Sequence, residues 1–165
     1  MKKEIILNTI IIQLIIIVSI GVTTLNGMGH QYIEITMEGR QTKVSSFNCA
    51  GFKGNCEYIN ETVYANCDIL LLQETWLHKF EFNMFNAKIK NCQYHAVSAM
   101  DDSDIGRVGR PKGGCAIVWH KDLALSILSI ETKSTRLCAV VVKSTRVNLV
   151  ICNVYMPQNN NTHET

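Results

Sequence analysis

The sequence predicts an α/β fold in which helices and sheets are stacked in layers, a layered α/β sandwich. Segments with helical periodicity occur in the first half of the chain, whereas the second half contains a succession of short strand-like runs. Two of these runs, 69–72 and 147–155, are apolar on both faces, which is typical of strands that are covered on two sides. A chain of 165 residues with 47% hydrophobic residues is long enough for one domain of this class.

The first 25 residues form a hydrophobic segment of their own. Lys2 and Lys3 precede an isoleucine-rich stretch at 5–22 that ends in small residues. This order resembles a signal peptide, and a stretch of this length is close to the minimum for a membrane span. The segment is therefore either a signal or anchor that contacts a membrane through residues 5–22, or an upstream stretch joined to the domain by a gene model. Two glycosylation sequons, at 60–62 and 160–162, do not decide between these readings.

The remaining chain divides into a linker and a domain. Residues 26–42 are expected to be a linker with one strand at 32–36, and the domain is expected to span residues 43–165. Within the domain, helices are predicted at 57–66 and 79–89. The predicted strands lie at residues 44–48, 69–72, 92–97, 114–120, 123–130, 136–143 and 147–155. The predicted loops lie at residues 50–55 and 100–113. A turn at residues 143–146 predicts that the last two strands pair as a hairpin.

Charge and cysteine content exclude some functions. The net charge of +2 gives no strong overall attraction to nucleic acid, so any basic site must be local. The seven cysteines include no Cys-x-x-Cys pair, which argues against a zinc site. Several of them lie in strand-like runs, where we expect them to be small buried apolar residues, and their odd number favours a reducing compartment.

Three predicted strands end in polar residues that can do chemistry: Asn48, Glu74 and Tyr155. If the strands share a sheet, their ends can converge at one rim, where active sites are often built. A carboxylate there is a suitable ligand for Mg²⁺, which accepts one or two carboxylates and keeps several waters. An amide could bind a phosphate oxygen, and a phenol could donate to a phosphate as charge develops. The alternative is that Glu74 is only a solvated strand end.

Four short motifs occur in an order that resembles the endonuclease/exonuclease/phosphatase family. They are SFNCAGF at 46–52, LQETWL at 72–77, GRPKGGCAI at 109–117 and NVYMP at 153–157. YHAVSAMD at 94–101 and RLCAV at 136–140 are similar to the endonuclease domains of animal non-LTR (LINE-type) retrotransposons. The resemblance covers about residues 43–158. It implies a DNase I-like four-layer α/β sandwich, of which roughly the first half to two thirds is expected here.

The resemblance also implies a chemistry, which is Mg²⁺-dependent hydrolysis of a phosphodiester in DNA. Glu74 matches the metal-binding glutamate of the family, and Asn48 matches the asparagine at the metal and phosphate. Tyr155 matches the tyrosine near the scissile phosphate. The family's later Asp-x-Asn and Ser-Asp-His motifs do not occur in this sequence. The resemblance therefore predicts a truncated domain of a retrotransposon endonuclease, a nuclear hydrolase by origin, that is inactive as written.

Other functions remain open at this point. Arg107, Arg110 and Lys112 could contact DNA phosphates, although three nearby aspartates nearly balance their charge. The chain could instead be a secreted or membrane-tethered phosphodiesterase of the same superfamily. It could also be a non-enzymatic remnant or an interaction module. His95 and His120 are expected to have packing or surface roles.

Overall fold

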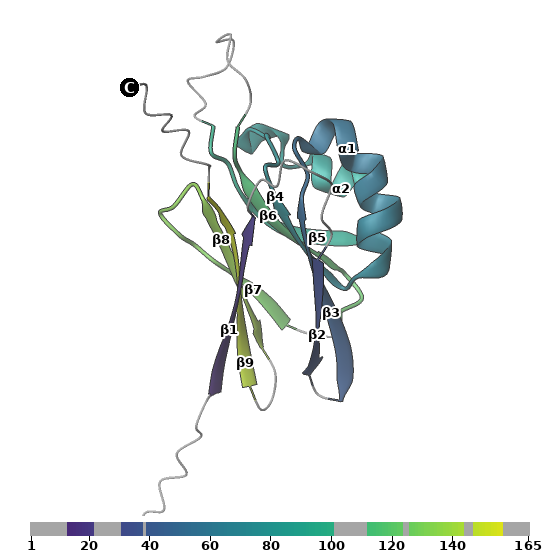
Figure 1. Cartoon of the computed structure of the whole chain (residues 1–165), viewed down its shortest axis with the longest axis vertical. Coiled ribbons are helices and arrows are strands. Elements are labelled where there is room, and N and C mark those ends of the chain that lie inside the picture. The colour runs from purple at the N-terminus through teal and green to yellow at the C-terminus, as the bar shows by residue number, and fades with distance from the viewer. Residues whose placement is uncertain are drawn as a thin grey trace, which may run out of the picture.

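A computed structural model of the chain describes residues 13–21, 31–37, 39–100, 112–123, 126–143 and 147–156. Two β-sheets pack against each other, and helices cover the outer face of one of them (Figure 1). The strands of the five-stranded sheet, in the order β2-β3-β4-β6-β5, are Gln31–Met37, Arg40–Asn48, Ile69–Gln73, Cys115–His120 and Cys92–Val97. The strands of the four-stranded sheet, in the order β1-β9-β8-β7, are Gln13–Gly21, Val147–Tyr155, Leu137–Lys143 and Ser126–Ile130.

Strand β4 lies at the centre of the molecule and is buried along its whole length, as its apolar run predicts. Alternate side chains point to opposite faces of a strand. Leu70 and Leu72 therefore belong to a core between the sheet and the helices, and Ile69 and Leu71 belong to a second core between the two sheets. The domain thus has two hydrophobic cores, and the five-stranded sheet separates them.

The four-stranded sheet is built on the predicted hairpin. β8 pairs with β9 in antiparallel register, and β9 has the bounds that the sequence predicts. On the inner face of β9, Leu149 and Ile151 are buried. On its outer face, Val150, Cys152 and Val154 are only half-buried. The prediction of two covered faces therefore holds for the inner face only, because the described helices all lie beyond the other sheet (Figure 1).

The first helix begins earlier than the sequence predicts. α1 spans Phe52–Tyr58 and continues through a π-helical turn, Ile59–Val63, and a 3₁₀ turn that ends at Asn66. The predicted loop at 50–55 is therefore largely helical. The reason lies in local side-chain hydrogen bonds: the Asn55 side-chain amide donates to the carbonyl oxygens of Cys49 (2.8 Å) and Gly51 (3.2 Å), which anchors the first turn.

The second predicted helix is split. A 3₁₀ turn at Lys79–Glu81 precedes the short helix α2, Met84–Lys88. The Glu81 carboxylate accepts from the His78 backbone N–H (3.1 Å) and pairs with Lys53, which closes the first turn on itself. Phe85 is buried in the helix-side core, but Phe80 is 60% exposed.

The N-terminal segments contribute strands. The strand expected at 32–36 is present within β2, which pairs with β3 in antiparallel register. β3 begins at Arg40, so the sheet begins within the segment 26–42. Of the hydrophobic first 25 residues, the structure describes 13–21, which form β1 in parallel register with β9. Within the described residues, no helix has the length and apolar character needed to cross a membrane.

Candidate active site at the rim of the sheets

The chain that follows β4 is held between two neighbouring segments. On one side, the backbone N–H groups of Gly51 and Phe52 donate to the carbonyls of Glu74 (2.8 Å) and Thr75 (3.0 Å). On the other side, the N–H groups of Thr75 and Trp76 donate to the carbonyls of residues 114 (3.3 Å) and 113 (3.1 Å). These bonds extend the sheet beyond its regular strands, so Glu74 occupies a fixed position at the rim.

This rim segment has an uncommon backbone. Glu74 has φ 54° and Trp76 has φ 53°, in the left-handed region that side chains with a Cβ disfavour. Such a conformation costs about 1–2 kcal/mol for each residue and persists only where the surroundings fix it. Close packing contributes to this: a Cβ built on Gly51 would lie 2.6 Å from the Trp76 ring, which therefore rests directly on the glycine backbone.

Asn48 and Glu74 are in direct contact. The Asn48 side-chain N–H donates to the Glu74 carboxylate at 3.0 Å, and the Asn48 side-chain oxygen accepts from the Ala50 backbone N–H at 3.1 Å. Because the Ala50 N–H can only donate, this second bond fixes which end of the amide faces Glu74. Glu74 is 7% exposed, so its carboxylate is oriented and nearly withdrawn from solvent.

Tyr155 reaches the same point from the other sheet. Burial raises the pKa of its phenol, and the nearby negative charge of Glu74 raises this pKa further. The ring lies beside Gly113, where an added Cβ would come within 3.4 Å of it. The Tyr155 backbone N–H donates to the Arg136 carbonyl at 2.9 Å. The three residues expected at strand ends, from segments more than 25 residues apart in the sequence, therefore come together.

Two basic residues lie beside Tyr155. A cavity of about 220 Å³ is lined by Ala99, Lys112, Gly113, Thr135, Arg136 and Tyr155. Lys112 is one of the three basic residues that the sequence suggests for DNA contact, and it lies at the candidate site. Arg107 and Arg110 lie outside the described residues.

Sequence reasoning missed Arg136 as a candidate site residue. The signal was available, because the predicted hairpin of the last two strands places the start of one beside the end of the other. Arg136 precedes β8 and Tyr155 ends β9, so the predicted pairing already brings them together.

The family of the chain follows from this arrangement and from comparison with known proteins. A model of the endonuclease/exonuclease/phosphatase family matches residues 45–164. The chain belongs to this family. The match includes all three strand ends of the candidate site. No curated protein matches the sequence.

The fold agrees with that assignment. The two packed sheets and their helices form the DNase I-like α/β fold that the sequence predicts for the family, in a form rich in sheet. The described elements make up three of the four expected layers, namely the helices and the two sheets.

Members of the endonuclease/exonuclease/phosphatase family are phosphodiester hydrolases and generally use divalent metals. Among the described residues, no three His, Cys, Asp or Glu side chains cluster as a ready metal site. Glu74 with the Asn48 amide nevertheless fits a hard cation that takes one carboxylate and completes its shell with water and phosphate oxygens. Within the part of the chain that the structure describes, the two side chains in contact at this rim are a carboxylate and an amide, which offer oxygen ligands and not the thiolates and imidazoles typical of zinc sites.

The Cys49 thiol, beside the Glu74 backbone, has a structural role. Cys49 is 2% exposed, and its thiol donates to the carbonyls of Gln73 (3.2 Å) and Glu74 (3.3 Å). Burial raises the pKa of this thiol to about 12, so it is protonated at neutral pH and is not a nucleophile. The prediction that the strand cysteines are buried apolar residues is confirmed for Cys92, Cys115 and Cys138, whereas Cys152 in β9 is only half-buried.

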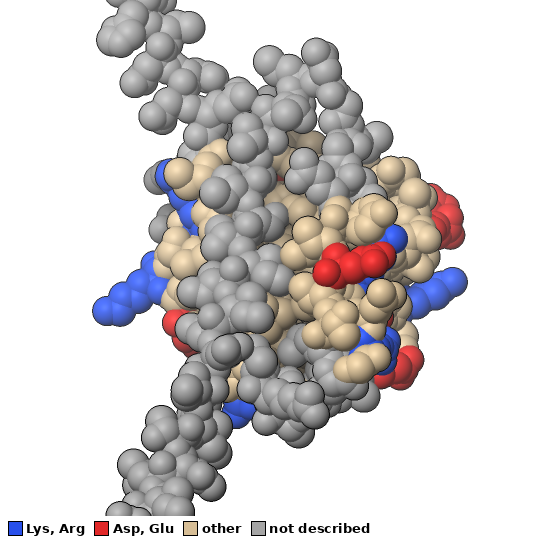
Figure 2. All heavy atoms as spheres, turned by 60° about the horizontal axis from the view of Figure 1, so that its bottom comes forward, with Lys and Arg blue, Asp and Glu red and all other residues tan. Residues whose placement is uncertain are grey.

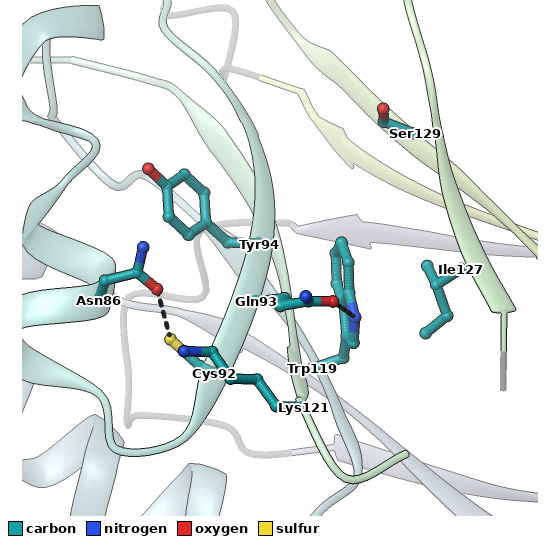
Figure 3. A pocket seen from close by; sticks show the side chains of 8 residues that line it. All are labelled: Asn86, Cys92, Gln93, Tyr94, Trp119, Lys121, Ile127 and Ser129. Atoms are coloured by element: carbon teal, nitrogen blue, oxygen red, sulfur yellow. Dashed lines mark hydrogen bonds between the residues drawn. The ribbon is translucent and has the colours of Figure 1, made fainter. Parts of the chain in front are cut away.

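A second cavity, of about 480 Å³, lies at the far end of β5 and β6 (Figure 3). The Trp119 indole N–H donates to the Gln93 side chain there at 3.1 Å, so both groups already have partners. Nearby, the His120 ring stacks on the Tyr64 ring at 4.1 Å, which confirms a packing role for that histidine. These residues lie away from Glu74, at the opposite end of the β5–β6 pair.

The surface charge of the described residues is mixed. Figure 2 shows acidic and basic side chains interspersed on the visible described surface, with no large area of one sign there. Basic residues near Tyr155 therefore act locally, as the small net charge predicts.

Proposed function

We propose that this chain carries the metal- and phosphate-binding part of a Mg²⁺-dependent, DNA-nicking endonuclease domain of the kind found in LINE-type retrotransposons. The observation that supports this most is the convergence of Asn48, Glu74 and Tyr155 beside a cavity lined by Lys112 and Arg136. The retrotransposon origin rests on the motifs at 94–101 and 136–140, which are similar to that subgroup.

Glu74 is the proposed ligand of Mg²⁺. Asn48 orients the carboxylate through its amide N–H and keeps it from rotating towards the protein interior. When Mg²⁺ is bound, it supplies a positive charge that offsets the charge of the phosphate. A single carboxylate makes a weak site for an ion that dehydrates reluctantly, so we expect low affinity.

Tyr155 is the proposed hydrogen-bond donor to the phosphate. Its raised pKa means that the phenol is protonated throughout the physiological range, so it can donate and does not repel an anion. The phenol lies near the Glu74 carboxylate, whose negative charge contributes to the raised pKa. A phosphate oxygen in the adjoining cavity would offer the phenol an anionic hydrogen-bond acceptor.

Lys112 and Arg136 are the proposed anchors of the DNA backbone. Contacts from basic side chains to phosphates hold a duplex in place without reading its sequence. The cavity that they share with Tyr155 has room for a phosphate group and a few waters.

Hydrolysis needs one more contribution, which is a base to accept the proton of the attacking water. Among the described residues, Glu74 is the only acidic side chain in contact with Asn48 or Tyr155, and it is already assigned to the metal. Missing a positioned base typically costs about 100-fold or more in rate. We therefore propose that the 165-residue chain binds DNA and Mg²⁺ weakly and does not nick DNA by itself.

The catalytic part of the proposal is tested by nicking of supercoiled plasmid DNA. The proteins compared are the 165-residue chain, a fusion of it to the C-terminal half of an active LINE-type endonuclease domain, and the fusion with Glu74→Ala or Tyr155→Phe. We expect nicking by the fusion alone, loss of nicking in Glu74→Ala, and slower nicking in Tyr155→Phe at unchanged DNA affinity. Robust nicking by the short chain that depends on Glu74 would contradict the assignment of an incomplete site.

The DNA-binding part is tested by fluorescence anisotropy over a series of salt concentrations. Lys112→Ala and Arg136→Ala should each lower the slope of log affinity against log salt by about 1, because each removes one phosphate contact. Lys121→Ala is the matched control, since this exposed lysine lies at the other end of β6. Equal effects of all three substitutions would show that binding is diffuse and not centred on Tyr155.

A further inference from the structure

The candidate site is divided between two sheets. Glu74 follows β4 in the five-stranded sheet, and Tyr155 ends β9 in the four-stranded sheet. The contacts between the sheets are mostly apolar, and apolar contacts are non-directional. They hold the sheets together but do not by themselves fix the position of one strand end relative to another.

A buried polar link crosses this apolar interface. The Gln73 side-chain N–H donates to the Asn153 side-chain oxygen at 2.5 Å, and both residues are at most 1% exposed. The Asn153 side-chain nitrogen donates in turn to the carbonyls of Leu72 (2.7 Å) and Ala116 (2.9 Å). Leu72 and Ala116 are register partners, so one side chain from β9 is bonded to β4 and β6 at the same level.

The chemistry of this link allows one orientation only. Carbonyl oxygens accept and do not donate, so the Asn153 nitrogen must face the two strands and its oxygen must face Gln73. The Gln73 nitrogen also lies 3.2 Å from the Ser46 hydroxyl, which extends the link to β3. Both amide N–H groups of Asn153 have acceptors, so the network is satisfied and can be rigid.

The link is next to both halves of the site. Gln73 immediately precedes Glu74 in the chain. Asn153 precedes Tyr155 by two residues, so their side chains leave the same face of β9. We propose that the Gln73–Asn153 pair is the positioning element that sets the Tyr155 phenol against the Glu74 carboxylate across the two sheets. The role of the Tyr155–Glu74 arrangement in phosphate binding rests on the proposed function, whereas the position of the Gln73–Asn153 pair does not.

The test observes the contact directly by NMR of the full chain labelled with ¹³C at the tyrosine ζ carbon. The Tyr155→Phe spectrum identifies the Tyr155 resonance, and Glu74→Gln shows how far it moves at pH 7.5 when the negative charge beside the phenol is removed. Gln73→Met removes the amide donor and keeps a similar volume. We expect it to move the Tyr155 resonance in the same direction as Glu74→Gln, by at least half as much.

Gln93→Met is the matched control. It also removes a glutamine side-chain hydrogen bond from the five-stranded sheet, at the other end of β5 from the site, and should leave the Tyr155 resonance in place. If Gln73→Met does not fold, Ser46→Ala decides. It removes the hydroxyl that accepts from Gln73, keeps the Gln73–Asn153 bond, and should move the resonance in the same direction by a smaller amount.

The inference would be overturned if the Tyr155 resonance stayed in place in folded Gln73→Met. If Gln73→Met does not fold, an unmoved resonance in Ser46→Ala would overturn it. The amide pair would then have a purely stabilising role. The measurement needs no catalysis. A fusion protein that fails to nick DNA while its Tyr155 resonance still responds to Gln73→Met would count against the proposed function and in favour of the positioning role.

Discussion

Gly114→Ala tests how tightly the rim segment is held. Gly114 has φ +84°, and a Cβ built on it would lie 2.5 Å from the Thr75 hydroxyl and 3.4 Å from the Val97 carbonyl oxygen. The left-handed backbone alone costs an alanine about 1–2 kcal/mol. Overpacking against a side chain that is 1% exposed adds about 1–3 kcal/mol. We expect Gly114→Ala to lower the free energy of unfolding by about 3 kcal/mol, measured by urea denaturation followed by tryptophan fluorescence.

Substitutions at two other glycines separate the backbone cost of Gly114→Ala from its steric cost. Gly39 has φ +80°, and no atom lies within 4 Å of the position that an alanine methyl group would take, so Gly39→Ala should cost about 1 kcal/mol for the backbone conformation alone. Gly54 lies in α1 in open space without a positive φ, so Gly54→Ala should stabilise the protein by about 1 kcal/mol. The excess cost of Gly114→Ala over Gly39→Ala then measures the steric contact.

A double-mutant cycle identifies the partner in that contact. The Thr75 hydroxyl has no hydrogen-bond partner, so its removal forfeits no bond. Combining Gly114→Ala with Thr75→Ala should recover about 1–2 kcal/mol relative to the sum of the two single effects. Thr75→Val keeps the branched shape and should recover nothing. Additivity in the alanine pair would refute the steric reasoning and leave the backbone conformation as the whole cost.

Three further predictions follow from the buried groups and the site. Burial raises the pKa of the thiols of Cys49 and Cys115 from 9.0 to about 12, and that of the Cys67 thiol from 9.0 to about 11. Each thiol therefore stabilises the folded state fully below pH 9. This stabilisation is lost as the pH rises from 9 towards the pKa of the thiol in the folded protein. The urea midpoint should fall between pH 8.5 and pH 10 by the equivalent of about 1 kcal/mol per thiol, and Cys49→Ala should reduce the fall; a constant midpoint would show that the thiols stay accessible. Mg²⁺ should bind the chain only weakly in calorimetric titration, and Glu74→Gln should abolish the binding, whereas submicromolar affinity or affinity unchanged in the variant would place the cation elsewhere. Asn48→Ala should weaken Mg²⁺ binding less than Glu74→Gln does, because it removes the group that orients the carboxylate and not the carboxylate itself. The same calorimetric titration measures this difference. An equal loss of affinity in the two variants would make Asn48 a direct ligand of Mg²⁺.

The central strand and the meeting of Asn48 with Glu74 could be predicted because each depends on a strong local pattern. A short apolar run bounded by polar residues predicts a buried strand, and polar residues at the ends of neighbouring strands of a sheet meet at its rim. Asn48 and Glu74 follow directly from this rule. Tyr155 belongs to the other sheet, and its approach to Glu74 depends on how two sheets pack, which no local pattern encodes.

Other features depend on individual side-chain hydrogen bonds that no periodic pattern encodes, some of them local and one between distant segments. The start of α1 is set by Asn55, whose bonds to Cys49 and Gly51 cannot be read from helical periodicity. A regular helix would place Phe80 in the core, but Glu81 closes the turn and directs Phe80 to solvent. The Gln73–Asn153 link joins positions 80 residues apart, so neither residue stands out in its own segment.

The division of the site between two sheets has a thermodynamic consequence. A ligand that contacts both Glu74 and Tyr155 would act as a reversible cross-link between layers that otherwise meet through an apolar interface. Opening motions that part the sheets would then be suppressed in proportion to ligand occupancy. Hydrogen exchange of the β8–β9 amides should slow when a phosphate-bearing ligand and Mg²⁺ are present. Amides of α1, on the far side of the five-stranded sheet, should exchange as before.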